Sequence, residues 1–142
     1  MELVWTDDLS IGNAMIDADH KMLLDMVNGV VHAIEIGDCS VLSYAFDLLD
    51  GKLRTHCAQE ENIAQAINFT FTRHKLAEQY ILRELNYLKD ELLDRNCVCC
   101  EDAIKHYSDS LRGLLIGHIT EDDRLMKPVL QSYPYNFNPV GS

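Results

Sequence analysis

The chain has 142 residues, of which 47% are hydrophobic and 25% charged, and its formal net charge is -11. This length and apolar content suit a single domain that buries its own core. The negative charge argues against binding to nucleic acid or to an anionic membrane surface, because both need clustered lysine and arginine.

The N-terminus and the cysteines favour the cytoplasm. The first residues show no basic region followed by an apolar stretch, so no signal peptide is expected. No segment approaches the roughly 18 apolar residues of a membrane span. The five cysteines are odd in number and irregularly spaced, which favours a reducing compartment over a disulfide framework. We therefore expect a cytoplasmic protein without membrane insertion.

Apolar residues at helical spacing predict two helices in the first half of the chain. The first is expected to begin with Asp17 as its N-cap and to end at Gly37. The second follows Asp38-Cys39-Ser40 and continues to about Asn68.

Two more helices are predicted in the second half. Thr70 or Thr72 is expected to cap the third, and the segment 93–100 breaks the apolar pattern. The fourth starts near Glu101 and is expected to end where Pro128 interferes.

Four helices of about 20 residues, each about 30 Å long, predict an all-α fold, a four-helix up-and-down bundle with an N-terminal loop arm. Residues 1–131 are predicted to form this domain. Residues 132–142 are expected to be a tail or a linker to an output domain.

Ligand-type side chains recur at helical spacing. Residues four apart lie on one helix face, so His56 with Glu60 and His74 with Glu78 each direct two such side chains to one side. His20 lies near the start of the first predicted helix. His118 and Asp123 lie near the end of the fourth.

This mixture of side chains favours iron. Imidazoles bind borderline metals, and a carboxylate can bridge two ions, so the set suits a pair of non-haem irons. Structural zinc sites favour cysteine, and magnesium or calcium prefer oxygen ligands throughout. A lone histidine on an apolar helix face is usually a core residue, but four in this order favour a metal centre. Manganese would suit the same ligands.

Three segments resemble the bacterial hemerythrin-like family, over about Trp5 to Leu130. The first comprises Trp5, Gly12 and Ile16-Asp17-Ala18-Asp19-His20-Lys21, the second His56 to Glu60 with Glu61, and the third the ten residues 114–123.

The resemblance implies specific roles. His20 and His56 would bind one iron, and His74 and His118 the other. Glu60 and Asp123 would bridge them, with Asp122 as the neighbouring competitor of Asp123. The cofactor would be two non-haem iron ions, oxo- or hydroxo-bridged, with dioxygen as ligand. Leu115, three residues before His118, would line the small apolar oxygen pocket.

The departure from the family pattern is Glu78. The family normally has a second histidine four residues after the one that His74 matches. Glu78 either binds the iron as a carboxylate, which favours the ferric state, or does not reach it and leaves a position for water. Both alternatives favour oxidation over reversible oxygen carriage.

The remaining histidines and cysteines are expected to have no ligand role. His32 and His106 lie outside the ligand pattern and are expected at the surface. Cys57 is expected to pack rather than to bind metal. The cluster Cys97-Val98-Cys99-Cys100 lacks a second cysteine pair, so a reduced loop cluster is favoured over a metal site or thiol switch.

The predicted function is oxygen binding and redox sensing, as the N-terminal sensor of a bacterial signalling protein such as a diguanylate cyclase. The domain itself is not expected to be an enzyme. Its ligands would be dioxygen or small anions, and its partner a covalently linked output domain. The alternatives are a stand-alone oxygen carrier or store, a diiron oxidase or nitric-oxide-handling protein, and a metal-free or zinc-stabilised interaction module.

Overall fold

The first long helix of the computed structural model begins earlier than predicted. The structure describes residues 2–139. The side chain of Asn13 accepts hydrogen bonds from the N–H groups of the second and third helical residues, so α1 spans Ala14–Ile36. Asp17 is therefore not the N-cap. It lies in the first turn and accepts a hydrogen bond from Ile11 N–H. As predicted, the helix ends at Gly37, whose φ of 77° favours glycine.

The next two helices differ in how they begin. Asp38 caps α2 (Cys39–Ala66) by accepting hydrogen bonds from two backbone N–H groups. The prediction that a threonine caps the third helix was wrong. Thr72 is the first residue of α3 (Thr72–Asp94), and the N-cap residue Phe71 makes no side-chain cap bond.

The last long helix changes its winding before Pro128. After α4 (Glu101–Gly117), the chain forms a π-helix, η2 (His118–Asp122), and then a 3₁₀-helix, η3 (Asp123–Met126). The short α5 (Lys127–Leu130) follows, with proline in its first turn. The sequence predicted one uninterrupted helix here, so the π-helix and the 3₁₀-helix were not predicted.

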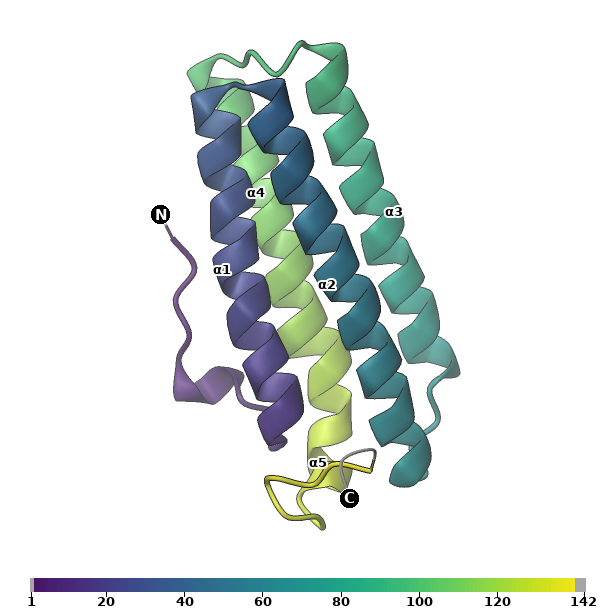
Figure 1. Cartoon of the computed structure of the whole chain (residues 1–142). Helices are drawn as coiled ribbons and strands as arrows, with labels where there is room; N and C mark the ends of the chain where they lie inside the picture. Colours follow the sequence, from purple (N-terminus) through teal and green to yellow (C-terminus); the bar gives the residue numbers. More distant parts are fainter. Residues whose placement is uncertain (1, 140–142) are drawn as a thin grey trace.

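The four long helices form the predicted up-and-down bundle (Figure 1). Helix α1 packs on α2 and α4, α2 packs on α3, and α3 packs less closely on α4. No strand occurs in residues 2–139. The predicted N-terminal arm runs beside α1, where the Asn28 side chain makes hydrogen bonds with both backbone groups of Leu3. The arm also contains the 3₁₀-helix η1 (Asp7–Leu9).

The core has two apolar clusters. The larger cluster fills the bundle from its loop end, where α1 joins α2, and reaches Leu115 and Ile119. The smaller cluster closes the other end and consists of Ile11, Ile16, Ile63, Ala64, Ile67, Met126 and Leu130. A polar layer between them is thus shielded from water at both ends.

The segment after α5 folds back onto the start of α1. The carbonyl of Tyr135 accepts a hydrogen bond from Ala14 N–H, and the carbonyl of Phe137 accepts one from the Asn13 side chain. Tyr133 and Phe137 pack against the smaller apolar cluster. Residues 140–142 of the predicted tail lie outside the described residues. Within residues 2–139, no helix has the length and hydropathy that a membrane crossing requires.

Candidate metal centre

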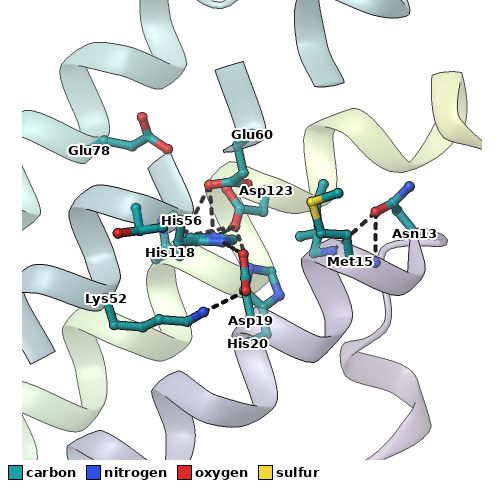
Figure 2. A network of polar contacts seen from close by, with 12 residues as sticks. Asn13, Met15, Asp19, His20, Lys52, His56, Glu60, Glu78, His118 and Asp123 are labelled. Atoms are coloured by element: carbon teal, nitrogen blue, oxygen red, sulfur yellow. Dashed lines mark hydrogen bonds and ion pairs between the residues drawn. The ribbon is translucent and has the colours of Figure 1, made fainter. Parts of the chain in front are cut away.

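The seven side chains predicted as ligands converge between the two apolar clusters. Figure 2 labels all of them except His74. They come from the first two turns of α1 and of α3, the second half of α2, and the turns that follow α4. All are almost fully buried: His20, His56, Glu60, His74, Glu78, His118 and Asp123. Burying so many ionisable groups is costly unless they are paired or bind a cation.

The ligand atoms fall into two groups that share two carboxylates. One group contains His20, His56 and His118, the other contains His74 and Glu78, and Glu60 and Asp123 belong to both. Within each group the ligand atoms lie within 4.8 Å of one another. Two carboxylates common to two adjacent groups have the arrangement that bridging ligands of a metal pair require.

Asp123 lies at the centre of the site. Its Oδ2 is 2.6 Å from His20 Nε2 and 2.8 Å from His118 Nε2, and its Oδ1 faces His74 Nε2. Asp122 belongs to neither group and is partly exposed. The structure therefore directs Asp123, rather than the competitor Asp122, into the cluster.

The π-helix explains how His118 and Asp123 face the same side. In an α-helix, residues five apart point about 140° away from each other at 3.6 residues per turn. Here Asp123 N–H donates to the His118 carbonyl, which is the i to i+5 hydrogen bond of a π-helix. This wider turn brings Asp123, five positions later, back above His118, so both side chains point inward.

The grouping of His118 differs from the predicted partition between two irons. Its ring centroid is 5.2 Å from that of His56 and 5.6 Å from that of His20, but 6.3 Å from that of His74. In this structure His118 thus lies nearer to the histidines of the other predicted iron. The assignment of each ligand to one ion stays a prediction.

Several buried polar atoms lack the partners that a protein interior normally supplies. Glu60 Oε1 faces His56 Nε2 at 2.9 Å, but Oε2 of Glu60 and Oε2 of Glu78 have, among the described residues, only the more distant His74 Nε2, at 3.6 Å and 3.8 Å. His56 and His118 bring their Nε2 atoms to within 3.1 Å of each other. Carboxylate oxygens with distant donors and converging ring nitrogens are what a bound cation would satisfy. The residues present therefore fit a metal centre.

Glu78 is inside the site rather than on a solvated helix face. Its side chain is buried, and Oε2 lies 3.8 Å from His74 Nε2, one helical turn earlier. Figure 2 shows it at the edge of the cluster. Burial and the nearby Glu60 carboxylate raise the pKa of Glu78 to about 9. A carboxylate that repels its neighbour in this way would be relieved by a cation between the two.

Pairing between the histidines and the carboxylates raises the pKa of His56 and His74 and lowers that of Asp123. Burial alone lowers the pKa of His56, but attraction by Glu60 and hydrogen bonds to Asp123 and Asp19 raise it well above its ordinary value. For His74, burial is likewise outweighed, and its pKa rises to about 10 beside Asp123 and Glu60. Burial raises the pKa of Asp123, but the surrounding histidines, first of all His118, hold it well below its usual value. Without metal, protons supply the positive charge of this site.

Asp19 and Lys52 are part of the site, although the sequence analysis gave neither a role. Asp19 Oδ2 accepts a hydrogen bond from His56 Nδ1 at 3.0 Å, and its Oδ1 accepts one from Lys52 Nζ at 2.8 Å. Burial raises the pKa of Asp19, but these two partners lower it overall. Because ionised Asp19 can only accept, Nδ1 keeps its proton, and His56 would offer the lone pair of Nε2 to a metal that displaces the proton there. The sequence signal for this contact was the four-residue spacing of Lys52 and His56, which places both side chains on the same face of a helix.

An aromatic ring and an apolar cavity flank the cluster. Phe71 stacks on His74, with 4.8 Å between ring centroids. Leu115, the predicted pocket residue, and His118 both line an apolar cavity among the four helices. A surface groove between α3 and α4, which includes Tyr80 and Gly117, also reaches His118. His118 is therefore next to both an interior cavity and a route from solvent.

The other histidines and cysteines were only partly predicted. His32 and His106 are exposed, as expected. The expectation that the cysteine cluster is a reduced loop was wrong for Cys97, which forms a disulfide with Cys39. Cysteine count alone cannot reveal a pair 58 residues apart that folding brings together.

Comparison with known proteins supports the geometry. The model of the hemerythrin HHE cation binding domain matches residues 11–130. The chain belongs to the hemerythrin family. The matched range contains all seven clustered side chains. No solved structure matches the chain.

This hemerythrin domain is similar to several bacterial relatives. It is 29% identical to a bacteriohemerythrin of Pseudomonas paraeruginosa over 128 residues and 27% identical to one of Pseudomonas aeruginosa over 126 residues. Each match covers 85% of this chain and 76% of the relative. A bacteriohemerythrin of Stenotrophomonas maltophilia is 25% identical over 127 residues. Family membership and the His, Glu and Asp cluster together indicate a non-haem iron site that binds a small ligand.

Proposed function

We propose that this domain holds two non-haem iron ions and uses them to sense oxygen or redox state. The observation that carries the proposal is the pair of buried ligand groups that share Glu60 and Asp123, with the ring nitrogens of four histidines converging on these two carboxylates. In this proposal His20 and His56 would bind one iron, His74 and His118 the other, and Glu60 and Asp123 would bridge them. The iron pair supplies the electrons for oxygen binding.

The surroundings of His118 support a small apolar ligand such as dioxygen. Leu115, Leu111 and Ile81 are among the apolar residues that line the cavity beside the His118 ring. This lining favours an uncharged diatomic molecule over bulk water, and it limits side reactions of a reduced metal. The groove between α3 and α4 supplies a path from solvent.

Glu78 favours a sensor over a reversible carrier. An anionic carboxylate near His74 stabilises the higher oxidation state of a metal, so oxygen is expected to oxidise the iron pair rather than leave again. Reduction would then reset the domain.

The C-terminal segment supplies a route for a signal. Met126 and Leu130 come shortly after Asp123 in the chain. Both pack in the smaller apolar cluster, together with Tyr133 and Phe137. A shift of Asp123 with the oxidation state of the iron would therefore move the segment that leads out of the domain. In a longer signalling protein, such as a diguanylate cyclase, this segment would connect to the output domain.

The first experiment is metal analysis together with the visible and near-ultraviolet spectrum. The protein is reduced without oxygen, spectra are recorded, and air is then admitted. We expect two irons per chain and ferric bands that appear in air and disappear only with a reductant. Hydrogen exchange of residues 127–139 in the reduced and oxidised protein tests the signalling route, because equal exchange would contradict it.

Each other outcome supports an alternative. A spectrum that reverses when oxygen is removed would favour an oxygen carrier or store. Continuous oxygen consumption with excess reductant would favour an oxidase, and rapid consumption of nitric oxide a nitric-oxide-handling protein. Protein that neither contains nor takes up iron would contradict the proposal and favour an interaction module.

A further inference from the structure

Four of the five cysteines lie at the end of the bundle opposite to the ligand cluster. Cys39 is the first residue of α2, while Cys97, Cys99 and Cys100 lie between α3 and α4 (Figure 1). The disulfide between Cys39 and Cys97 joins residues 58 positions apart, with 5.4 Å between their Cα atoms. It ties the α1–α2 turn to the connection between α3 and α4.

The two turns fit closely around this bond. Cys97 has a φ of 62°, and its N–H donates to the Leu92 carbonyl at the end of α3. A Cβ atom at Gly37 would lie 3.2 Å from the Cys97 carbonyl oxygen. The backbone therefore holds Cys97 against the neighbouring turn and specifies which cysteine pairs with Cys39.

Accessibility does not explain the pairing. Cys97 is completely buried, whereas Cys100 is exposed and forms no disulfide within the described chain. Cys39 is partly exposed, so it is the half of the bond that lies nearer to solvent.

We propose that the Cys39–Cys97 pair is a reversible thiol–disulfide exchange site for small dithiols and disulfides. To open it, a dithiol thiolate attacks Cys39 Sγ, the Cys39–Cys97 bond breaks, and Cys97 leaves as a thiolate and takes a proton. The second thiol of the reagent then displaces Cys39 and forms an intramolecular disulfide. The protein gains two electrons and two protons, and the dithiol loses them.

Closure uses a small disulfide such as oxidised glutathione. The Cys39 thiolate attacks it and releases one glutathione thiolate. Cys97 then attacks Cys39 Sγ in the mixed disulfide and releases the second. Two glutathione thiols are formed for each protein disulfide, so electrons and atoms balance.

The exchange site holds the far end of the helix that supplies two predicted ligands. Helix α3 carries His74 and Glu78 in its first two turns and ends shortly before Cys97. Helix α3 packs mainly on α2, and the disulfide adds a covalent link between the segment that follows α3 and the start of α2. Opening the bond is expected to loosen residues 92–97. This expectation does not depend on whether the other end holds metal.

The test uses the complete chain in buffers with different ratios of reduced to oxidised glutathione. Free thiols are alkylated under native conditions and after unfolding, and the Cys39–Cys97 peptide is quantified by mass spectrometry. We expect the bond to disappear and return with the ratio, in one transition, while circular dichroism stays helical. Native hydrogen exchange at residues 92–97 is expected to rise at least tenfold when the bond opens.

Matched variants separate the site from general thiol effects. Cys39→Ser should show the fast exchange at residues 92–97 without any reductant, whereas Cys100→Ser should keep both the transition and the slow exchange. A bond that persists in the folded protein under excess dithiol would overturn the proposal, as would a bond that oxidised glutathione never forms. Equal hydrogen exchange in Cys39→Ser and the unmodified chain would overturn the role in holding α3.

Discussion

At the scale of single residues, Glu78 is the position at which the proposed chemistry can be tested most directly. Its carboxyl group is buried and lies 3.8 Å from His74 Nε2. Without metal, burial and the Glu60 carboxylate raise the pKa of Glu78 to about 9, whereas a cation bound between them would let both groups ionise. Such a pair stabilises a more highly charged metal.

Replacing Glu78→His should slow oxidation of the reduced iron-loaded protein by air about tenfold or more. Removing one negative charge near a metal destabilises the ferric state, and a tenfold change corresponds to only about 1.4 kcal/mol. The rate is followed by stopped-flow absorbance. Asp90→His, at an exposed position on the same helix, is the control and should leave the rate unchanged. Equal rates in the Glu78 variant and the parent protein would show that Glu78 does not influence the iron.

Asp19 is the second residue whose role can be isolated. It fixes the His56 tautomer through Nδ1 and is itself held by Lys52. Asp19→Asn keeps the shape but removes the charge, so we expect iron affinity to fall about tenfold. Competition with a chelator measures the affinity, and Asp25→Asn on the exposed face of α1 is the control. An unchanged affinity would mean that Lys52 and Asp19 only pair with each other.

At the scale of elements, the ends of the helices matter most, because the predicted ligands are concentrated there. The π-turn at His118 is needed to point Asp123 inward. The start of α1 is fixed by Asn13, which caps the helix and also donates to the Phe137 carbonyl. One side chain thereby joins the first helix of the bundle to the C-terminal segment.

Asn13→Ala should lower the free energy of unfolding by about 1 to 2 kcal/mol. The loss of a helix cap accounts for about 1 kcal/mol, and the lost hydrogen bond to Phe137 adds to it. Urea unfolding followed by circular dichroism gives the change. Asn86→Ala on the exposed surface of α3 should cost less than about 0.5 kcal/mol. A similar effect for both variants would contradict the capping role.

At the scale of the whole molecule, the buried polar layer makes stability depend on pH. The pKa of His74 is raised to about 10 in the folded protein, so its contribution is complete below about pH 6.5 and is lost as pH rises toward 10. The pKa of Glu78 is raised to about 9, so its ionisation opposes folding from about pH 4.5 upward. Above neutrality, both groups lower the free energy of unfolding as the pH rises.

The Tm of metal-free protein should therefore fall steadily between pH 6 and pH 9. Iron-loaded protein should instead lose stability toward acid pH, because metal ligands must be deprotonated. Scanning calorimetry of both forms measures the two trends. A metal-free Tm that is constant or rises over this range would show that protons do not replace metal in the polar layer.

The sequence by itself determined the fold class and the set of histidines and carboxylates that cluster inside the bundle. Apolar residues at helical spacing are sufficient to predict four helices, since each must bury one face. The order of His20, His56, Glu60, His74, His118 and Asp123 matched a family pattern that places such residues on the inner faces of a bundle.

Tertiary structure alone decided the features that depend on contacts between distant segments. Whether Glu78 lies in the site depends on how α3 packs against α2, which no local pattern specifies. The π-helix, the pairing of Asp19 with His56 and the disulfide between Cys39 and Cys97 have the same origin. Each joins residues, or satisfies backbone groups, only after the helices have packed, because packing, and not local spacing, determines which buried groups meet.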